Sequence, residues 1–69
     1  MLHPIRAYRH KQELTLAAFA AKAGTSAGTI SRIEHGTLRP TLELLRRLSE
    51  ATDGEVTADA IIASTPRAA

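Results

Sequence analysis

Residues 16–35 constrain the fold of this 69-residue chain more than any other stretch. Small and apolar side chains recur there at helical spacing on both sides of one glycine: Phe19, Ala20 and Ala23 before Gly24, and Ile30 and Ile33 after it. This pattern predicts two short helices, Leu16–Ala23 and 27–35, that cross at a steep angle about a tight turn. Helices that cross steeply touch at only a few points, so the residues at those points must be small or apolar.

Three residues fit the crossing and the turn between these two helices. Ala20 is small where the two backbones come closest, and Gly24 suits the left-handed conformation in which helices commonly end. Ser26 is the expected N-cap of the second helix, since its hydroxyl can accept a hydrogen bond from a backbone N–H one turn along. The stretch is therefore predicted to be a helix-turn-helix, a motif whose second helix enters the major groove of DNA.

Three further helices are predicted around this motif. The first covers residues 4–12, because Pro4 suits a first helical turn and Ile5, Tyr8 and Arg9 recur at helical spacing. Thr15 is the expected N-cap of the second helix. Gly36 is the expected stop of the third.

A fourth helix is predicted from Thr41 onward. Its predicted buried stripe consists of Leu42, Leu45, Leu48 and Thr52. Leu44 falls outside this stripe. Asp53 and Gly54 end this helix, and Thr57 caps a short fifth helix that carries Ile61 and Ile62.

The predicted fold is thus all-α, one compact five-helix domain over residues 1–63 in which helices two and three form the helix-turn-helix. Residues 64–69 have too little apolar side chain to dock, and we expect a disordered tail there.

The composition excludes several classes of function. There is no cysteine, so neither disulfides nor thiolate metal sites can form. Three histidines lie on separate segments without ligand spacing, so solvated or capping roles are expected and no metal or other cofactor: His3, His10 and His35. So small a helical chain leaves little room for a substrate pocket, and we predict that it is not an enzyme. No apolar run approaches the roughly 20 residues of a membrane span, and we expect a cytoplasmic protein associated with the nucleoid through DNA.

The net charge of +2 is unevenly distributed. Residues 1–40, which contain the helix-turn-helix, carry six lysine and arginine residues against two glutamates, a balance of +4. Residues 41–69 carry three arginines against five acidic residues, a balance of −2. This asymmetry suits a polyanionic partner at one face, although ordinary surface charge also produces such patterns.

Taken together, these features resemble the lambda-repressor-like DNA-binding domains, the phage Cro and repressor type also called the xenobiotic-response-element family. The resemblance runs from Ile5 to about Ile62 and rests on the segments IRAYR, LTLAAFAAKAGTS, TISRIEHG and the RP before the fourth helix. They match that family's I-R-x-x-R, L-[ST]-x-x-x-[LF]-A, G-[VT]-S, I-S-x-[IL]-E-x-G and R-P. The resemblance implies the five-helix fold and binding to double-stranded DNA.

By this resemblance, the positions that face DNA bases are Ala27, Gly28, Ser31 and Arg32. Arg32 is the strongest candidate, because a guanidinium can bond both O6 and N7 of guanine, which provides about 1 to 3 kcal/mol of discrimination. An arginine that touches only phosphate is the alternative. Ala27 and Gly28 depart from the longer polar side chains common in the family, so we expect readout to depend on Arg32 and on DNA shape.

The DNA backbone has a larger set of candidate contacts. Thr15 and the N–H groups at the start of the second helix, including that of Leu16, form the kind of phosphate site that helix N-termini offer. The further candidates are Ser26, Thr29, Arg39 and, more weakly, Lys22. Glu13 replaces a glycine that is frequent in the family, and its charge would disfavour a phosphate nearby unless it points away.

The resemblance also implies a structural ion pair between Arg9 and Glu34, which would tie the first helix to the end of the third. Two solvated side chains are the alternative. Removing one partner of a deeply buried pair costs about 3 to 5 kcal/mol.

Three functions are consistent with the sequence. The first is a DNA-binding transcriptional regulator, a repressor of phage, plasmid or mobile-element type, that acts as a homodimer on a pseudo-palindrome. The second is the antitoxin of a toxin–antitoxin pair, whose toxin protein would bind a patch formed by Leu44, Ile61 and Ile62. The third is a protein-interaction module that no longer binds DNA, favoured by the small residues Ala27 and Gly28.

Overall fold

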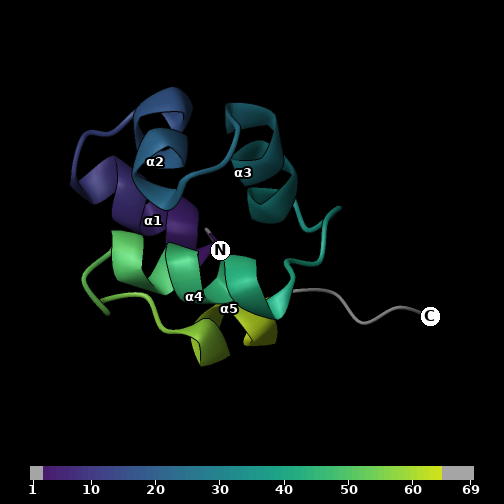
Figure 1. Ribbon diagram of the computed structural model, residues 1–69. Helices are drawn as coiled ribbons and strands as arrows, with labels where there is room; N and C mark the ends of the chain where they lie inside the picture. Colours follow the sequence, from purple (N-terminus) through teal and green to yellow (C-terminus); the bar gives the residue numbers. More distant parts are fainter. Residues whose placement is uncertain (1–2, 65–69) are drawn as a thin grey trace.

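Five α-helices follow one another along residues 3–64, the part of the chain that this computed structural model describes (Figure 1). Their bounds are α1 Pro4–Lys11, α2 Leu16–Ala23, α3 Ala27–Glu34, α4 Leu42–Ala51 and α5 Ala58–Ala63. The predicted all-α fold is confirmed, and no strand occurs in the described range. Apart from Ser64, the predicted disordered tail lies outside the described residues.

Side chains close the first turn of every helix. In four helices a hydroxyl accepts a hydrogen bond from the backbone N–H three residues on, at 3.0 to 3.2 Å: Thr15, Ser26, Thr41 and Thr57. In α1 the Nδ1 atom of His3 accepts from the N–H of Ile5 at 3.1 Å. Thr15, Ser26 and Thr57 are the predicted caps. Residues 12 and 35 were expected inside α1 and α3, but Gln12 and His35 are the C-caps of helices that end one residue earlier.

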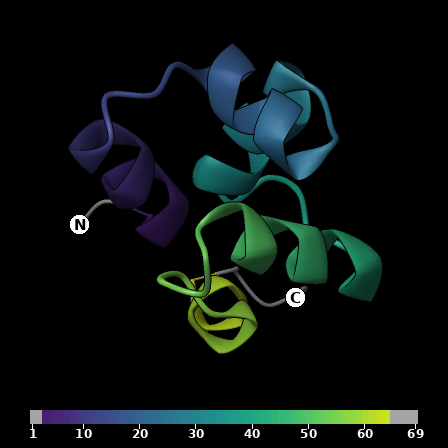
Figure 2. The same ribbon diagram turned by 60° about the vertical axis from the view of Figure 1, so that its left-hand side comes forward.

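The helices enclose one apolar core. The largest fully buried side chains come from all five helices: Ile5, Phe19, Ile30, Ile33, Leu48 and Ile61. Helix α2 packs against both α3 and α4, while α1 and α4 each contact α5 (Figures 1 and 2). The rings of Tyr8 and Phe19 meet edge to face with centroids 6.0 Å apart, joining α1 to α2. None of the described helices has the length and apolar character needed to cross a bilayer.

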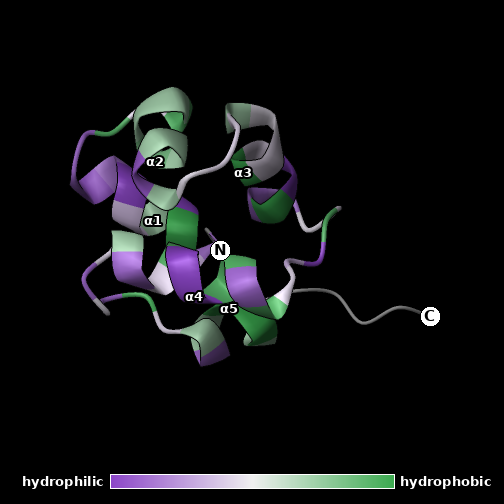
Figure 3. Ribbon diagram, viewed as in Figure 1, coloured by the Kyte–Doolittle hydropathy of each residue, from purple (hydrophilic) through white to green (hydrophobic). Residues whose placement is uncertain are grey.

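The buried face of α4 differs from the predicted stripe. Leu42 was expected in the core but is 81% exposed, whereas Leu44, expected outside the stripe, packs partly buried against the core. The core-facing side consists of Leu44, Leu45, Leu48, Ala51 and Thr52. At 100° per residue, Leu42 lies about 120° from the centre of that arc, so the spacing to Leu45 alone misplaced it. Figure 3 shows polar and apolar residues alternating along α4.

The prediction that Leu44, Ile61 and Ile62 form a surface patch is also wrong. Ile61 is completely buried because it faces the core from α5, and only Ile62 is largely exposed, at 54%. Within residues 3–64, the large apolar side chains that are mostly exposed are those of Leu42 and Ile62.

Candidate nucleic-acid interface

Helices α2 and α3 form the predicted helix-turn-helix. The turn begins at Gly24, whose φ of 71° is left-handed, and the N–H of Thr25 donates to the carbonyl of Ala20 at 2.9 Å. Ala20 and Ala23 are buried, as predicted for small residues in this motif. The chain therefore leaves α2 sharply and starts α3 only three residues later.

Both helices of the motif begin at the same end of the molecule, at the top of Figure 1. We call residues 15–17 together with Ser26 and Thr29 the helix-start surface. Thr15 Oγ1 accepts from the N–H of Ala18. The N–H groups of Leu16 and Ala17 have no acceptor within the helix, because they lie in its first turn. Two helix N-termini side by side give this surface a partial positive charge, which suits phosphate groups.

Helix α3 exposes one face and buries the other. Ile30 and Ile33 are buried, whereas Gly28, Arg32 and His35 are exposed at a spacing of four and three residues. Ala27 and Ser31 lie half-buried at the edge of that exposed face. The guanidinium of Arg32 forms no ion pair within residues 3–64, so its charge is directed at solvent.

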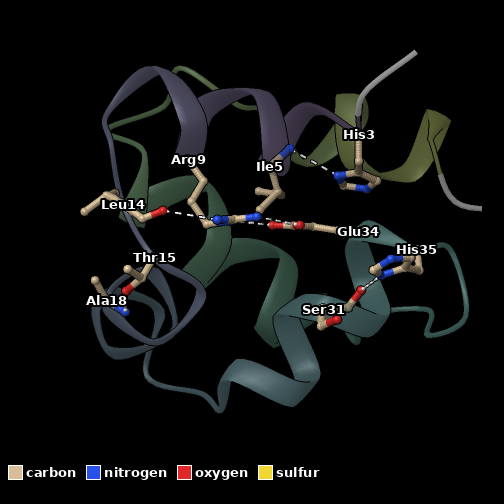
Figure 4. A network of polar contacts seen from close by, with 9 residues as sticks. All are labelled: His3, Ile5, Arg9, Leu14, Thr15, Ala18, Ser31, Glu34 and His35. Atoms are coloured by element: carbon tan, nitrogen blue, oxygen red, sulfur yellow. Dashed lines mark hydrogen bonds and ion pairs between the residues drawn. The ribbon is translucent and has the colours of Figure 1, made fainter.

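His35 belongs to this face; it is exposed and is the C-cap of α3, which agrees with the predicted solvated or capping role. Its Nδ1 atom donates to the carbonyl of Ser31 at 2.7 Å, which fixes the ring beside the last turn of α3 (Figure 4). The sequence did contain a signal for this placement, since His35 follows Arg32 by three residues and Gly28 by seven.

Ser26 and Thr29 are joined to each other at the start of α3. Their hydroxyl oxygens lie 2.9 Å apart, and the N–H of Thr29 donates to Ser26 Oγ at 3.2 Å. Both side chains therefore stabilise the first turn of α3 while remaining at the helix-start surface.

The other candidate backbone contacts do not all lie together. Arg39 is exposed in the segment that follows α3, and Leu16 packs its side chain partly against the core. Lys22 lies near the far end of α2, with Nζ 5.9 Å from the centroid of the Tyr8 ring. Lys22 is thus separated from the helix-start surface by most of the length of α2.

An ion pair between Arg9 and Glu34 supports α3 from behind (Figure 4). Arg9 Nε and Nη2 donate to the two carboxylate oxygens of Glu34 at 2.9 and 3.1 Å, and Nη1 donates to the carbonyl of Leu14 at 3.1 Å. The hydrogen bond to Glu34 raises the pKa of Arg9 above its usual value. This fork ties α1, the segment before α2 and the end of α3 together, and so fixes the tilt of the exposed face.

Comparison with known families is consistent with this geometry. The helix-turn-helix family model of the lambda-repressor-like type matches residues 5–57. The chain belongs to this family. No individual curated protein and no solved structure gives a significant match. This lambda-repressor-like domain is a DNA-binding domain of the kind found in transcriptional regulators.

Proposed function

We propose that this lambda-repressor-like domain is a sequence-specific repressor of phage, plasmid or mobile-element type that acts on double-stranded DNA in the cytoplasm. The observation that carries the proposal is the exposed face of α3, which is held at a fixed tilt by the Arg9–Glu34 pair and presents Arg32, which forms no ion pair with any residue from 3 to 64. A rigid helix with one exposed cation fits the major groove, where residues near its start meet the base edges.

Each part of the interface has its own role in this proposal. Arg32 reads a guanine, with Ala27, Gly28 and Ser31 beside it against the neighbouring bases. The helix-start surface, through Thr15, Ser26, Thr29 and the N–H of Leu16, holds phosphates, and Arg39 and Lys22 add charge. The phosphate contacts position α3, and the base contacts select the sequence.

Two copies would bind as a homodimer, with their α3 helices in successive major grooves about 34 Å apart. The exposed Leu42 and Ile62 support this part of the proposal, because they offer apolar surface to a second chain.

Fluorescence anisotropy with a duplex obtained by in-vitro selection, and with its scrambled counterpart, tests the function. Arg32→Ala is expected to weaken selected-duplex binding about 5- to 150-fold and to relax one base position. Arg39→Ala should weaken binding to both duplexes and reduce the salt dependence by about one counterion. Arg46→Ala is the matched control, since it removes the same charge from an α4 side chain paired with Glu43 and Glu50. Equal losses on both duplexes for Arg32→Ala would contradict base reading.

An antitoxin is the second candidate, and the same exposed Leu42 and Ile62 favour it, since a toxin protein could cover them. Co-purification of a toxin encoded next to this chain would support it, and a homodimer with no other partner would count against it. Absence of binding to any genomic DNA fragment at about 50 mM salt would instead support a protein-interaction module.

A further inference from the structure

Neither the backbone conformation nor the packing of the protein requires glycine at position 28. Gly28 lies in the first turn of α3 with ordinary helical backbone angles, and a Cβ built there would meet only Ser26 Oγ, at 4.0 Å. That distance is ordinary van der Waals contact. Neither conformation nor packing therefore excludes alanine, although glycine within a helix costs up to about 1 kcal/mol relative to alanine.

Gly28 is bordered by a hydroxyl that is already hydrogen-bonded and by a methyl group. Its neighbour Ala27 contributes only a methyl group, and the hydroxyls of Ser26 and Thr29 are bonded to each other at 2.9 Å. The side chains at positions 27 and 28 thus offer no hydrogen-bond donor or acceptor to a base edge. We call the Cα of Gly28 and the methyl of Ala27 the apolar notch.

Resting on the proposed function, we infer that the apolar notch receives the 5-methyl group of a thymine, so that Gly28 is a specificity-determining residue. Thymine is the base whose major-groove edge carries a methyl group, which suits a site with space and no polar side chain. Without a Cβ at position 28, the start of α3 lies closer to the DNA by about the depth of that methyl. The absence of a side chain at position 28 is then explained by the thymine methyl group that occupies the space.

Substituting deoxyuridine for thymine removes this methyl group and leaves every hydrogen-bonding group of the base pair in place. In the selected duplex, each thymine is replaced singly by deoxyuridine, and the Kd is measured by anisotropy. One position should lose about fourfold in affinity, the equivalent of one buried methyl-sized group. No loss at any thymine, or a selected site without thymine, would overturn the inference.

The variant Gly28→Ala makes the test specific to the notch, because its new methyl fills the space left for the thymine methyl. It should bind the thymine duplex at least about fourfold more weakly than the unmodified protein, and should bind the deoxyuridine duplex at least as well as the thymine duplex. The same variant should have a Tm about 4 °C higher, since alanine favours the helix. Gain of stability with loss of affinity separates a DNA contact from damage to the fold.

Arg32→Ala is the control that separates the two proposals, since it removes a different base contact and should retain the preference for thymine over deoxyuridine. If Gly28→Ala retains that preference too, the notch is wrong while base reading by Arg32 stands. If the unmodified protein binds all duplexes equally, both the notch and the proposed function are wrong.

Discussion

His3 is a buried histidine whose charge state is linked to folding. The residue is only 9% exposed, Nδ1 accepts from the N–H of Ile5, and Nε2 is buried without a hydrogen-bond partner among the described residues (Figure 4). Burial lowers the pKa of His3 below its ordinary value of 6.5, and the nearby Glu34 carboxylate only partly opposes this effect. A second proton would also occupy Nδ1, which caps α1.

Acid should therefore destabilise the protein through His3. As the pH falls below about 6.5, the unfolded chain takes up the proton before the folded one, and stability decreases until the lowered pKa of the folded state is passed. Between pH 7.5 and 5, the free energy of unfolding measured by urea denaturation should decrease less for His3→Asn than for the unmodified protein. Asparagine can cap α1 but does not titrate in this range. His10→Asn, at an exposed position of α1, is the control, and an equal decrease in all three proteins would refute the role of His3.

The Arg9–Glu34 pair is a buried side-chain contact that ties α3 to α1. The Glu34 side chain is 3% exposed and that of Arg9 12%, so removal of one charge leaves the other buried without its partner. Glu34→Gln should lower the free energy of unfolding by about 3 to 5 kcal/mol. Glu55→Gln removes the exposed partner of Lys11 and should cost at most about 1 kcal/mol. Similar small costs for both variants in chemical denaturation would show that the buried pair contributes little.

Residue-scale contacts were only partly predictable from the sequence. Two charges 25 positions apart carry no local signal, so the pair between Arg9 and Glu34 was expected only because of the family resemblance. Capping roles were among those predicted for the histidines, and His3 and His35 are caps, but neither the burial of His3 nor the bond from His35 to the Ser31 carbonyl could be predicted. Both depend on where the helices meet, and a lone histidine is equally compatible with solvent.

At the scale of the helices, the end of α1 has an unfavourable residue. Glu13 adopts a left-handed φ of 55°, with its N–H donating to the His10 carbonyl and that of Leu14 to the Arg9 carbonyl. This is the helix ending in which glycine is preferred, since glycine has no side chain to strain at a positive φ. A side chain in this conformation costs about 1 kcal/mol or more.

Glu13→Gly should therefore raise the free energy of unfolding by about 1 kcal/mol, measured by urea denaturation. Gly24→Ala is the reverse control, because it places a side chain at a φ of 71° after α2 and should lower stability by a similar amount. A lower stability for Glu13→Gly would mean that the glutamate side chain contributes more than its backbone conformation costs.

Element types and starts were the most predictable features, since hydroxyl caps such as Thr15 and Thr57 act within one turn of their own helix. The phase of α4 was not, because Leu42 and Leu44 are chemically alike and only the positions of the neighbouring helices decide which one is buried. The same limit applied to Ile61 and Ile62 on α5.

At the scale of the whole molecule, the charge asymmetry of the sequence and the direction of the helices act together. The cationic half of the chain contains α2 and α3, and both helices begin at one end of the molecule (Figure 1). That end binds a polyanion mainly through backbone N–H groups, because Arg9 and Lys11 are paired with glutamates and Lys22 lies near the far end of α2. The bases that it selects are not encoded in the fold, since they depend on contacts that form only in the complex.

Binding at this end should stabilise the entire domain, because the five helices share one core and DNA binds only the folded state. With free selected duplex at about 100 times its Kd, the free energy of unfolding should increase by about 2.7 kcal/mol, and the Tm should increase by on the order of 10 °C. The Tm, measured from the unfolding of the protein by differential scanning calorimetry, should increase much less with the scrambled duplex. In Arg32→Ala, the increases in Tm with the two duplexes should become more alike, because the variant loses a base contact but keeps the helix-start surface. If both duplexes stabilise the unmodified protein equally at every salt concentration tested, α3 binds DNA without selecting its sequence.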